Sequence, residues 1–475
     1  MPDTETWLRP SLGIVAGVTL LRLGLLAFDR TDLFVDESQY WLWGQDFAFG
    51  YYSKPPLIAW VIGAVTAVFG DAPFWVRAPG AVFHGGTALI LGALAARMQG
   101  AQAAVWVAAA YVTLPFVAVG SLLISTDTIM APFFAAALYF HRRLVTGGGM
   151  GTALLCGAMA GVAFLAKYAA IYFLGGVALA AFIYPAMRIA PRHVLALLVA
   201  FGAVMAPNIL WNLNNDLTTV SHTMDNVGWL RSDNPLSQLS LMRVAEFLAS
   251  QFAVFGPIMG IALIIAAVRR GTDKTLFPFI LPALMIVSGQ ALLEKAYANW
   301  AVSAYFAGTV VAMAVLMARP RLLRASLVIN GLVCVALPLL TMFPQASLGR
   351  DAPLLKRYLG RADLTRQITA ASKSLGPVPI VAVSRDVLAD LFYTGAHSGL
   401  TFLSVPATGR ALNHYAQTYP LSAANVGQVL FVTSIPPVCD GAIPAPVIQF
   451  NTVGGAYDGD GLAGYMIEAS CLAPR

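Results

Sequence analysis

Charged side chains are scarce in this sequence, and their scarcity indicates which solvent surrounds the chain. Asp, Glu, Lys and Arg make up only 11% of the 475 residues, whereas hydrophobic residues make up 58%. An ordinary soluble domain has about 25% charged and about 45–50% apolar residues. The composition therefore argues against a soluble protein. The net charge of +6 comes from arginines in short loops between apolar runs, so we read it as a membrane-orientation signal and expect no nucleic-acid partner.

Sequence motifs of soluble nucleotide-binding and metal chemistry are also missing. The chain contains no GxxxxGK[ST] phosphate loop, no GxSxG and no His/Cys cluster with zinc spacing. Soluble nucleotide-binding chemistry therefore has no support in the sequence. We predict no metal ligands and no certain cofactor, while a divalent metal requirement stays open.

Long apolar runs are abundant instead. Runs such as 11–28 and 244–268 approach the roughly 20 residues that cross about 30 Å of hydrocarbon. The first run contains Arg22 and no small-residue cleavage site follows it, so we expect a retained span rather than a signal peptide. The sequence predicts about eleven transmembrane helices. They lie near 11–28, 74–97, 101–120, 124–140, 152–167, 169–186, 194–210, 244–268, 276–293, 298–318 and 325–343.

Basic loops set the predicted orientation. By the positive-inside rule they are cytoplasmic, which places the N-terminus inside and the C-terminus outside. The segment 55–69 is short for a crossing and would invert every later basic loop, so we expect an interfacial or re-entrant helix there. Residues 29–73 and 211–238 then form external loops. The basic loops are Arg97, 141–143, Arg188, Arg192, 269–274 and 319–324.

The composition changes to that of an ordinary globular domain after about residue 344. Buried strands are predicted at 379–384 and 428–434, beside helix-like segments. We therefore divide the chain into a transmembrane domain, 1–343, and a small external α/β domain, 344–475.

The four cysteines fall into two pairs by their surroundings. Cys156 and Cys334 lie in apolar runs and are expected to be buried structural thiols. Cys439 and Cys471 lie in the predicted external domain, where the compartment permits oxidation. We predict that they form a disulfide, although sequence alone does not establish the geometry.

The first predicted external loop carries two adjacent acids, Asp36 and Glu37, followed by an aromatic-rich stretch. One interpretation is that they are solvated charges beside an interfacial aromatic belt that includes Tyr52. The other is that one carboxylate acts as a general base, which takes a proton from an acceptor hydroxyl. Lys54 precedes two prolines that hold the backbone extended. It is either a phosphate-binding cation or a lysine that snorkels to the membrane surface.

Further polar residues map to external helix ends. Asp127 lies at the start of a predicted span, where Thr126 or Asp127 could be an ordinary N-cap. Lys167 interrupts an apolar run, and a charge at that depth requires a partner or ligand. His222 and Asn299 are further external polar positions. We therefore expect acids and lysines from separate segments to converge on one membrane face.

These segments together resemble the bacterial branch of the dolichyl-phosphate-mannose protein mannosyltransferase family, which includes the aminoarabinose and galacturonic acid transferases of lipid A. The resemblance rests on the first-loop acids, KPPLIAW (54–60), the TD at 126–127, FLAKY (164–168) and the ANW at 298–300. It covers residues 11 to about 343. Where the aminoarabinose transferase has an acid before the KPP lysine, this chain has Ser53, which weakens any inference of a metal.

The resemblance implies a GT-C fold with horizontal helices in the first external loop and a cavity that opens outward. It implies inverting transfer from a polyprenyl-phosphate sugar to a lipid or cell-envelope glycan, at the periplasmic face of a bacterial inner membrane. By motif position, Asp36 or Glu37 is the first acid and Asp127 the second. Lys54 and Lys167 would contact the donor phosphate, and Tyr52, His222 and Asn299 would bind substrate.

Two other classes of function use the same features. A transporter or flippase of lipid-linked sugars would also place charges in the membrane, although the sequence shows no repeats with matching interrupted helices. A non-catalytic assembly protein would bind the same carriers. Formation of a covalent product distinguishes the transferase from both.

Overall fold

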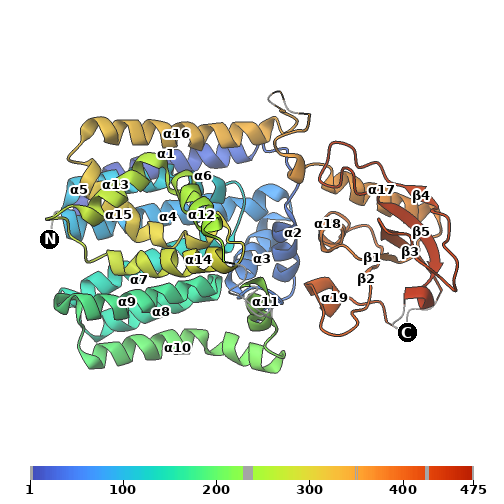
Figure 1. Ribbon diagram of the computed structural model, residues 1–475, viewed down its shortest axis with the longest axis horizontal. Coiled ribbons are helices and arrows are strands. Elements are labelled where there is room, and N and C mark those ends of the chain that lie inside the picture. Colours follow the sequence, from blue (N-terminus) through green and yellow to red (C-terminus); the bar gives the residue numbers. More distant parts are fainter. Residues whose placement is uncertain (1–3, 228–238, 348, 350, 423–426, 473–475) are drawn as a thin grey trace. The chain divides into compact units, whose positions relative to one another are not determined.

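The computed structural model describes residues 4–227, 239–347, 349, 351–422 and 427–472 (Figure 1). It is mostly helical and divides into two compact units. We call them the helical unit and the C-terminal unit and describe each by itself. The helical unit consists of Met1–Ala27, Ala48–Val61 and Phe74–Leu339, and the C-terminal unit consists of Phe28–Phe47, Ile62–Pro73 and Leu340–Arg475. The functional boundary at residue 343 stays a prediction.

The predicted apolar runs fold as helices, with two departures from the prediction. The run 101–120 is divided into two helices at Leu114, before Pro115, and a polar helix at 218–227 lies within the predicted external loop 211–238. The helix expected at 55–69 is also present, and the full set follows. These are α1 (Thr4–Leu26), α3 (Leu57–Phe69), α4 (Pro73–Gln99), α5 (Ala101–Thr113), α6 (Pro115–Gly120), α7 (Thr126–Val145), α8 (Met150–Ala166), α9 (Ile171–Ile183), α10 (Pro191–Asn214), α11 (Thr218–Val227), α12 (Leu241–Phe255), α13 (Pro257–Val268), α14 (Leu281–Leu293), α15 (Ala304–Leu316) and α16 (Pro320–Met342). Residues 228–238 of the predicted second external loop lie outside the described residues.

Fewer helices are long enough to cross a membrane than the sequence predicts. Within the described ranges, four helices have the necessary length and apolar character, and α12 with α13 forms a fifth candidate if the pair is one span. That pair is bent by 112°. The run 244–268 is therefore not one continuous helix, because Gly256 has φ +88° and Pro257 starts a new helix. The chain is a multi-pass membrane protein, while eleven crossings stay a prediction. The four long helices are Thr6–Leu26, Pro73–Gln99, Pro191–Asn214 and Pro320–Met342.

Small residues allow close packing of α8 in the helical unit. Helix α8 packs against both α7 and α10 (Figure 1). Gly157 and Gly161 are spaced by four residues and face α10, where a Cβ on Gly157 would lie 2.0 Å from the Leu197 carbonyl oxygen. Lipid tails are as apolar as the helices, so association in a membrane depends on such close backbone approach.

The charge within the first apolar run is buried. Arg22 Nη2 donates to the Val112 carbonyl at 2.6 Å and contacts Cys334 Sγ at 3.1 Å. The Cys334 thiol therefore accepts from a buried cation in addition to its packing role. Cys156 and Cys334 are both free and buried, as predicted.

The C-terminal unit contains a five-stranded mixed sheet with the order β2-β1-β3-β5-β4. Strand β1 pairs in parallel with β2 and β3, whereas β5 pairs antiparallel with β3 and β4. The predicted strands at 379–384 and 428–434 are confirmed as β1 and β3. The strands are β1 (Ile380–Ala382), β2 (Phe402–Ser404), β3 (Gln428–Thr433), β4 (Ile448–Gln449) and β5 (Ala463–Glu468), and the helices are α2 (Val35–Gly44), α17 (Arg361–Ser374), α18 (Arg385–Thr394) and α19 (His414–Thr418).

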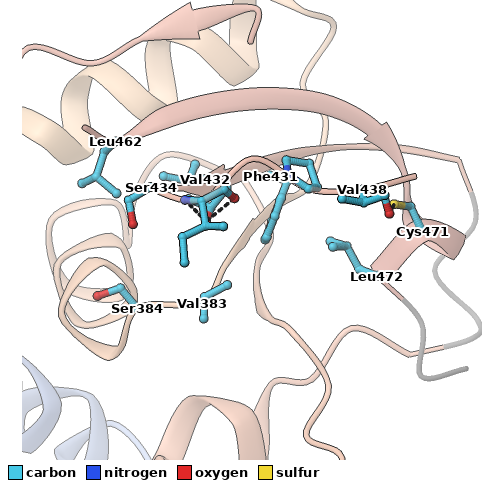
Figure 2. A pocket seen from close by; sticks show the side chains of 12 residues that line it. Val383, Ser384, Phe431, Val432, Ser434, Val438, Leu462, Cys471 and Leu472 are labelled. Carbon is cyan, nitrogen blue, oxygen red and sulfur yellow. Dashed lines mark hydrogen bonds between the residues drawn. The ribbon is translucent and has the colours of Figure 1, made fainter. Parts of the chain in front are cut away.

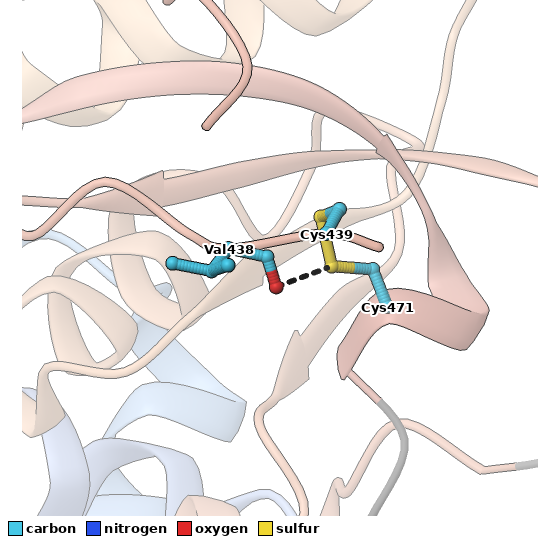
Figure 3. Close-up of a disulfide and its surroundings, with 3 residues drawn as sticks. All are labelled: Val438, Cys439 and Cys471. Carbon is cyan, nitrogen blue, oxygen red and sulfur yellow. Dashed lines mark hydrogen bonds between the residues drawn. A yellow bond between two sulfur atoms is a disulfide. The ribbon is translucent and has the colours of Figure 1, made fainter. Parts of the chain in front are cut away.

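The structure joins Cys439 and Cys471 in a disulfide with 5.4 Å between their Cα atoms (Figure 3). Cys471 Sγ also lies 3.7 Å from the Val438 carbonyl oxygen. A sulfur in a disulfide carries no hydrogen to donate, so we treat this approach as a packing contact. The bond ties the segment after β3 to the 3₁₀ turn η7 (Ala469–Leu472) that follows β5.

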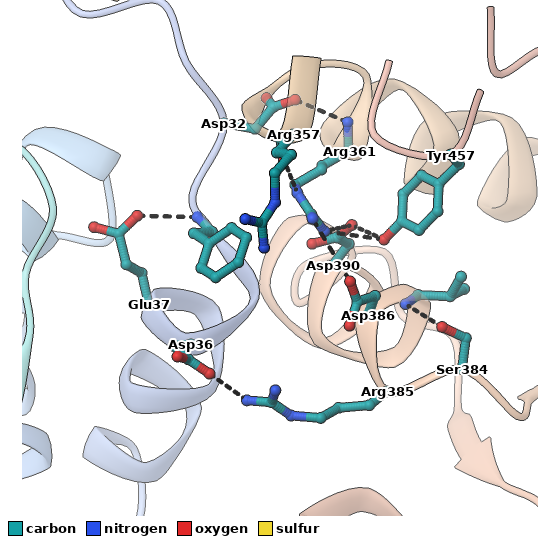
Figure 4. Close-up of polar contacts among 12 residues, drawn as sticks. Asp32, Asp36, Glu37, Arg357, Arg361, Ser384, Arg385, Asp386, Asp390 and Tyr457 are labelled. Atoms are coloured by element: carbon teal, nitrogen blue, oxygen red, sulfur yellow. Dashed lines mark hydrogen bonds and ion pairs between the residues drawn. The ribbon is translucent and has the colours of Figure 1, made fainter. Parts of the chain in front are cut away.

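A buried polar network fixes the start of α17. The Asp32 carboxylate accepts the backbone N–H groups of Arg361 at 2.9 Å and Ala362 at 3.3 Å, which satisfies donors at the helix N-terminus. The Arg361 side chain donates to Asp390 at 3.2 Å, and the Tyr457 hydroxyl donates to the same carboxylate oxygen (Figure 4). Burial raises the pKa of Asp390 to about 7, against the opposing effects of Arg361 and Tyr457.

The Gly157 contact predicts the effect of adding one methyl group. Gly157→Ala should lower stability by about 1–3 kcal/mol, because its Cβ would overlap the α10 backbone. Gly151→Ala is the control in the same helix, since nothing lies within 4 Å of its added Cβ. Thermal unfolding in detergent measures both variants. Equal midpoints for the two would contradict this packing.

The Asp390 network predicts a pH dependence of stability. Folded Asp390 binds its proton more tightly than an unfolded aspartate with a pKa of about 3.9. Its stabilising contribution is therefore complete below about pH 4 and is lost as the pH rises through about 7. Relative to Asp390→Asn, the wild type should lose stability across this window. The unfolding midpoints of both proteins are measured from pH 4 to 8. If the difference between wild type and Asp390→Asn is the same at every pH, the raised pKa of Asp390 is refuted.

Candidate functional site

Asp127, Lys167 and Asn299 form a polar cluster in the helical unit. Lys167 Nζ donates to both carboxylate oxygens of Asp127 at 2.8 Å, and Asn299 Nδ2 donates to Oδ2 at 3.3 Å. The lysine and aspartate side chains are only 19% and 12% exposed. Three residues that the sequence placed in separate segments therefore meet at one point, and Lys167 has the partner that its depth requires.

Local backbone structure explains how each member reaches the cluster. Ser125, rather than Thr126 or Asp127, is the N-cap of α7 and accepts the Thr128 N–H, so the Asp127 carboxylate is available for Lys167. Lys167 adopts an extended conformation between the end of α8 and the 3₁₀ turn η1 (Tyr168–Ala170). Lys167 is the C-cap of α8, so its positive charge lies near the negative end of the helix dipole, which stabilises it. Asn299 lies in the 3₁₀ turn η5 (Ala298–Ala301).

The ion pair does not use all the hydrogen-bond donors of Lys167. A lysine ammonium has three donors, and two of them point at Asp127. Neither side chain is fully buried, so one donor can turn toward an incoming phosphate oxygen. In a partly dry site such a charge-assisted contact is stronger than it would be in water.

The segment that carries Tyr52 and Lys54 is held by helices of the same unit. Thr219 Oγ1 donates to the Tyr51 carbonyl and Asn208 Nδ2 to the Phe49 carbonyl, each at 2.6 Å. The Tyr52 and His222 rings pack with centroids 4.9 Å apart. These two predicted substrate-binding residues therefore lie together. Lys54 comes two residues after Tyr52, on a segment whose backbone is held at Phe49 and Tyr51.

The sequence interpretation missed the polar residues of α10. Asn208 and Asn212 are buried, and Tyr168 Oη donates to Asn208 Oδ1 at 3.1 Å. Asn212 Nδ2 donates to the Tyr168 hydroxyl at 3.3 Å. The chain of contacts joins the neighbour of Lys167 to the Phe49 carbonyl. The sequence did contain a signal for this polar network, because two asparagines stand four residues apart near the end of an apolar run.

The first-loop acids belong to the C-terminal unit and differ in their surroundings. Glu37 is buried, and its Oε2 accepts the Phe34 N–H at 2.9 Å at the start of α2. The Asp36 side chain is 45% exposed and pairs through Oδ1 with Arg385 (Figure 4). Convergence of these acids with Asp127, Lys54 and Lys167 stays a prediction.

A pocket of about 410 Å³ in the C-terminal unit is lined by Cys471 of the disulfide, but by none of the predicted catalytic, phosphate-binding or substrate-binding residues. It lies beyond the carboxyl ends of β1 and β3, where Val383, Ser384, Ser434 and Val438 contribute to its wall (Figure 2). Among the described residues, no group of three or more His, Cys, Asp or Glu is arranged to hold a metal ion.

Comparisons with known proteins identify the family of the chain. Residues 53–211 match the family model described as dolichyl-phosphate-mannose-protein mannosyltransferase. The chain is 41% identical over 98% of its length to the lipid A galacturonosyltransferase RgtD of Rhizobium johnstonii, of which 99% is covered.

Solved structures of ArnT from Cupriavidus metallidurans share the fold. The apo form superposes with a TM-score of 0.62 at 15% identity, and covers 98% of this chain and 99% of that one. The form bound to undecaprenyl phosphate gives a TM-score of 0.63 at 14% identity, with 98% and 100% covered. The fold is therefore the predicted GT-C fold. Together with the whole-length identity to RgtD, this shows that the chain belongs to the bacterial branch of the dolichyl-phosphate-mannose protein mannosyltransferase family.

Proposed function

We propose that this protein transfers galacturonic acid from a polyprenyl-phosphate carrier to lipid A, with inversion, at the periplasmic face of a bacterial inner membrane. The observation that carries the proposal is the 41% identity to the lipid A galacturonosyltransferase RgtD along the whole chain. The cluster of Asp127, Lys167 and Asn299 supplies a place for the chemistry.

The reaction requires a base and a stabilised leaving group. The acceptor hydroxyl oxygen bonds to the anomeric carbon while the bond from that carbon to the carrier phosphate breaks. The phosphate leaves with the electron pair, and Lys167 and Lys54 stabilise its growing negative charge. The hydroxyl proton passes to a carboxylate. Asp127 orients Lys167 through its two short contacts.

Asp36 is a better base than Glu37. Glu37 is buried and uses one carboxylate oxygen to bind the backbone at the start of α2. Asp36 is partly exposed, and its contact with Arg385 engages Oδ1. Within the described part of the chain, Oδ2 of Asp36 accepts no hydrogen bond, so this oxygen can receive a proton. We therefore assign the catalytic role to Asp36 and a structural role to Glu37. Tyr52, His222 and Asn299 contact the substrate in this proposal.

The proposal predicts the behaviour of two variants in a transfer assay. Purified protein is incubated with lipid A and a labelled polyprenyl-phosphate galacturonic acid, and mass spectrometry detects the product. Asp36→Asn should lower the rate by about 10²–10⁴-fold, because the base is lost. Lys54→Ala should lower it through loss of phosphate stabilisation.

Asp363→Asn is the control, since it removes an exposed carboxylate of α17 and should leave the rate unchanged. A galactosyl donor, which lacks the sugar carboxylate, tests the choice of sugar. Undiminished transfer by both Asp36→Asn and Lys54→Ala would refute the site. Absence of any product with lipid A would refute the acceptor.

A further inference from the structure

Helix α2, which carries Asp36, is tied to the rest of the C-terminal unit at three places. At its start, Asp32 accepts the first N–H groups of α17. At its other end, Trp41 Nε1 donates to the Asp71 carboxylate at 2.7 Å, and the Tyr393 hydroxyl of α18 donates to the Asp71 carbonyl. Between them lies Arg385, which contacts α2 directly.

Arg385 holds two side chains that lie one helical turn apart. Its Nη2 donates to Asp36 Oδ1 at 2.5 Å, and its Nε donates to Gln39 Oε1 at 3.0 Å. Residues spaced by three share one face of a helix, so a rigid guanidinium fork can bind both at once. A lysine ammonium lacks this fork. The contact therefore fixes the rotation of α2 as well as the direction of the Asp36 carboxylate.

The surroundings of Arg385 keep it charged and correctly placed. Arg385 is the first residue of α18, and the Ser384 side chain accepts the Val387 N–H to cap that helix (Figure 4). Burial alone would lower the pKa of Arg385, but the Asp36 charge and hydrogen bond outweigh this effect and raise it. Burial and the nearby Arg385 lower the pKa of His414 to about 4, so at neutral pH this histidine adds no competing cation.

We infer that Arg385 is a positioning residue for the transfer reaction. It holds Oδ1 of Asp36 so that Oδ2 is presented to the acceptor hydroxyl. This inference rests on the proposed function of Asp36 as the base. The inferred role of Arg385 gives the C-terminal unit a part in catalysis. The sequence does not show this role, because Arg385 and Asp36 are 349 positions apart.

A double-mutant cycle tests the inference. Arg385→Met should lower kcat by about 10- to 100-fold, because a small misplacement of a catalytic group has an effect of that size, while KM for the donor changes less than about twofold. Arg385→Lys should recover part of the lost rate through its charge. In the Asp36→Asn background, Arg385→Met should have no further effect, because its action passes through Asp36. Arg366→Met is the control for loss of an exposed arginine.

The outcomes separate this inference from the proposed function. Full activity of Asp36→Asn would refute the role of Asp36 itself. Loss of activity in Asp36→Asn with full activity in Arg385→Met would refute only the positioning role. Independent, multiplicative losses in the double variant would also refute it. If Arg385→Met does not fold, the same cycle is run with Arg385→Lys, whose kcat should lie below that of the wild type with an unchanged KM.

Discussion

The ion pair between Lys167 and Asp127 is the interaction on which the helical unit's candidate site depends. Each partner alone would be an uncompensated charge in an apolar setting, where the cost of burial is several kcal/mol per ion. Together they satisfy one another and join the start of α7 to the break after α8. In the proposed function, the pair fixes the position of the cation that meets the carrier phosphate. Asn299 adds a third segment to the same carboxylate.

Polar contacts organise the C-terminal unit in a comparable way. Val35 of the first loop packs into the hydrophobic core of this unit, and polar contacts add to that packing. Asp32, Asp36 and Asp71 each bind a partner near α17 or α18, so three carboxylate-bearing residues hold one short helix. The contact between Asp36 and Arg385 then has two proposed roles, because it stabilises the C-terminal unit and orients the carboxylate that acts as the base.

Much of the architecture could be predicted because membrane helices are encoded locally. Long apolar runs predicted the helices, and short continuous apolar segments predicted β1 and β3. The break in the run 244–268 was missed although Gly256 and Pro257 form a strong turn signal, because the length of this mostly apolar run suits a single crossing. Strands β2, β4 and β5 were missed. Strand β4 is only two residues long, and β5 contains Gly464, which weakens a strand pattern.

The candidate site was predictable where a residue conflicted with its surroundings. Lys167 in an apolar run required a partner. That partner is Asp127, to which Asn299 also donates. Arg385 and Asn208 were not predictable in this way. Arginine at a helix start is ordinary, and only the fold brings it to Asp36. Asn208 likewise gains its meaning from Phe49 and Tyr168, which are distant in sequence.

The central claim, that Lys167 binds the carrier phosphate, is tested most directly by ligand-induced stabilisation. A polyprenyl monophosphate is titrated into wild type and into the Lys167→Met/Asp127→Asn double variant, in which no lone charge remains buried. Ligand that binds the folded state raises the unfolding midpoint with concentration. Our account predicts this rise in the wild type and its loss in the double variant. Equal rises in both proteins would contradict it.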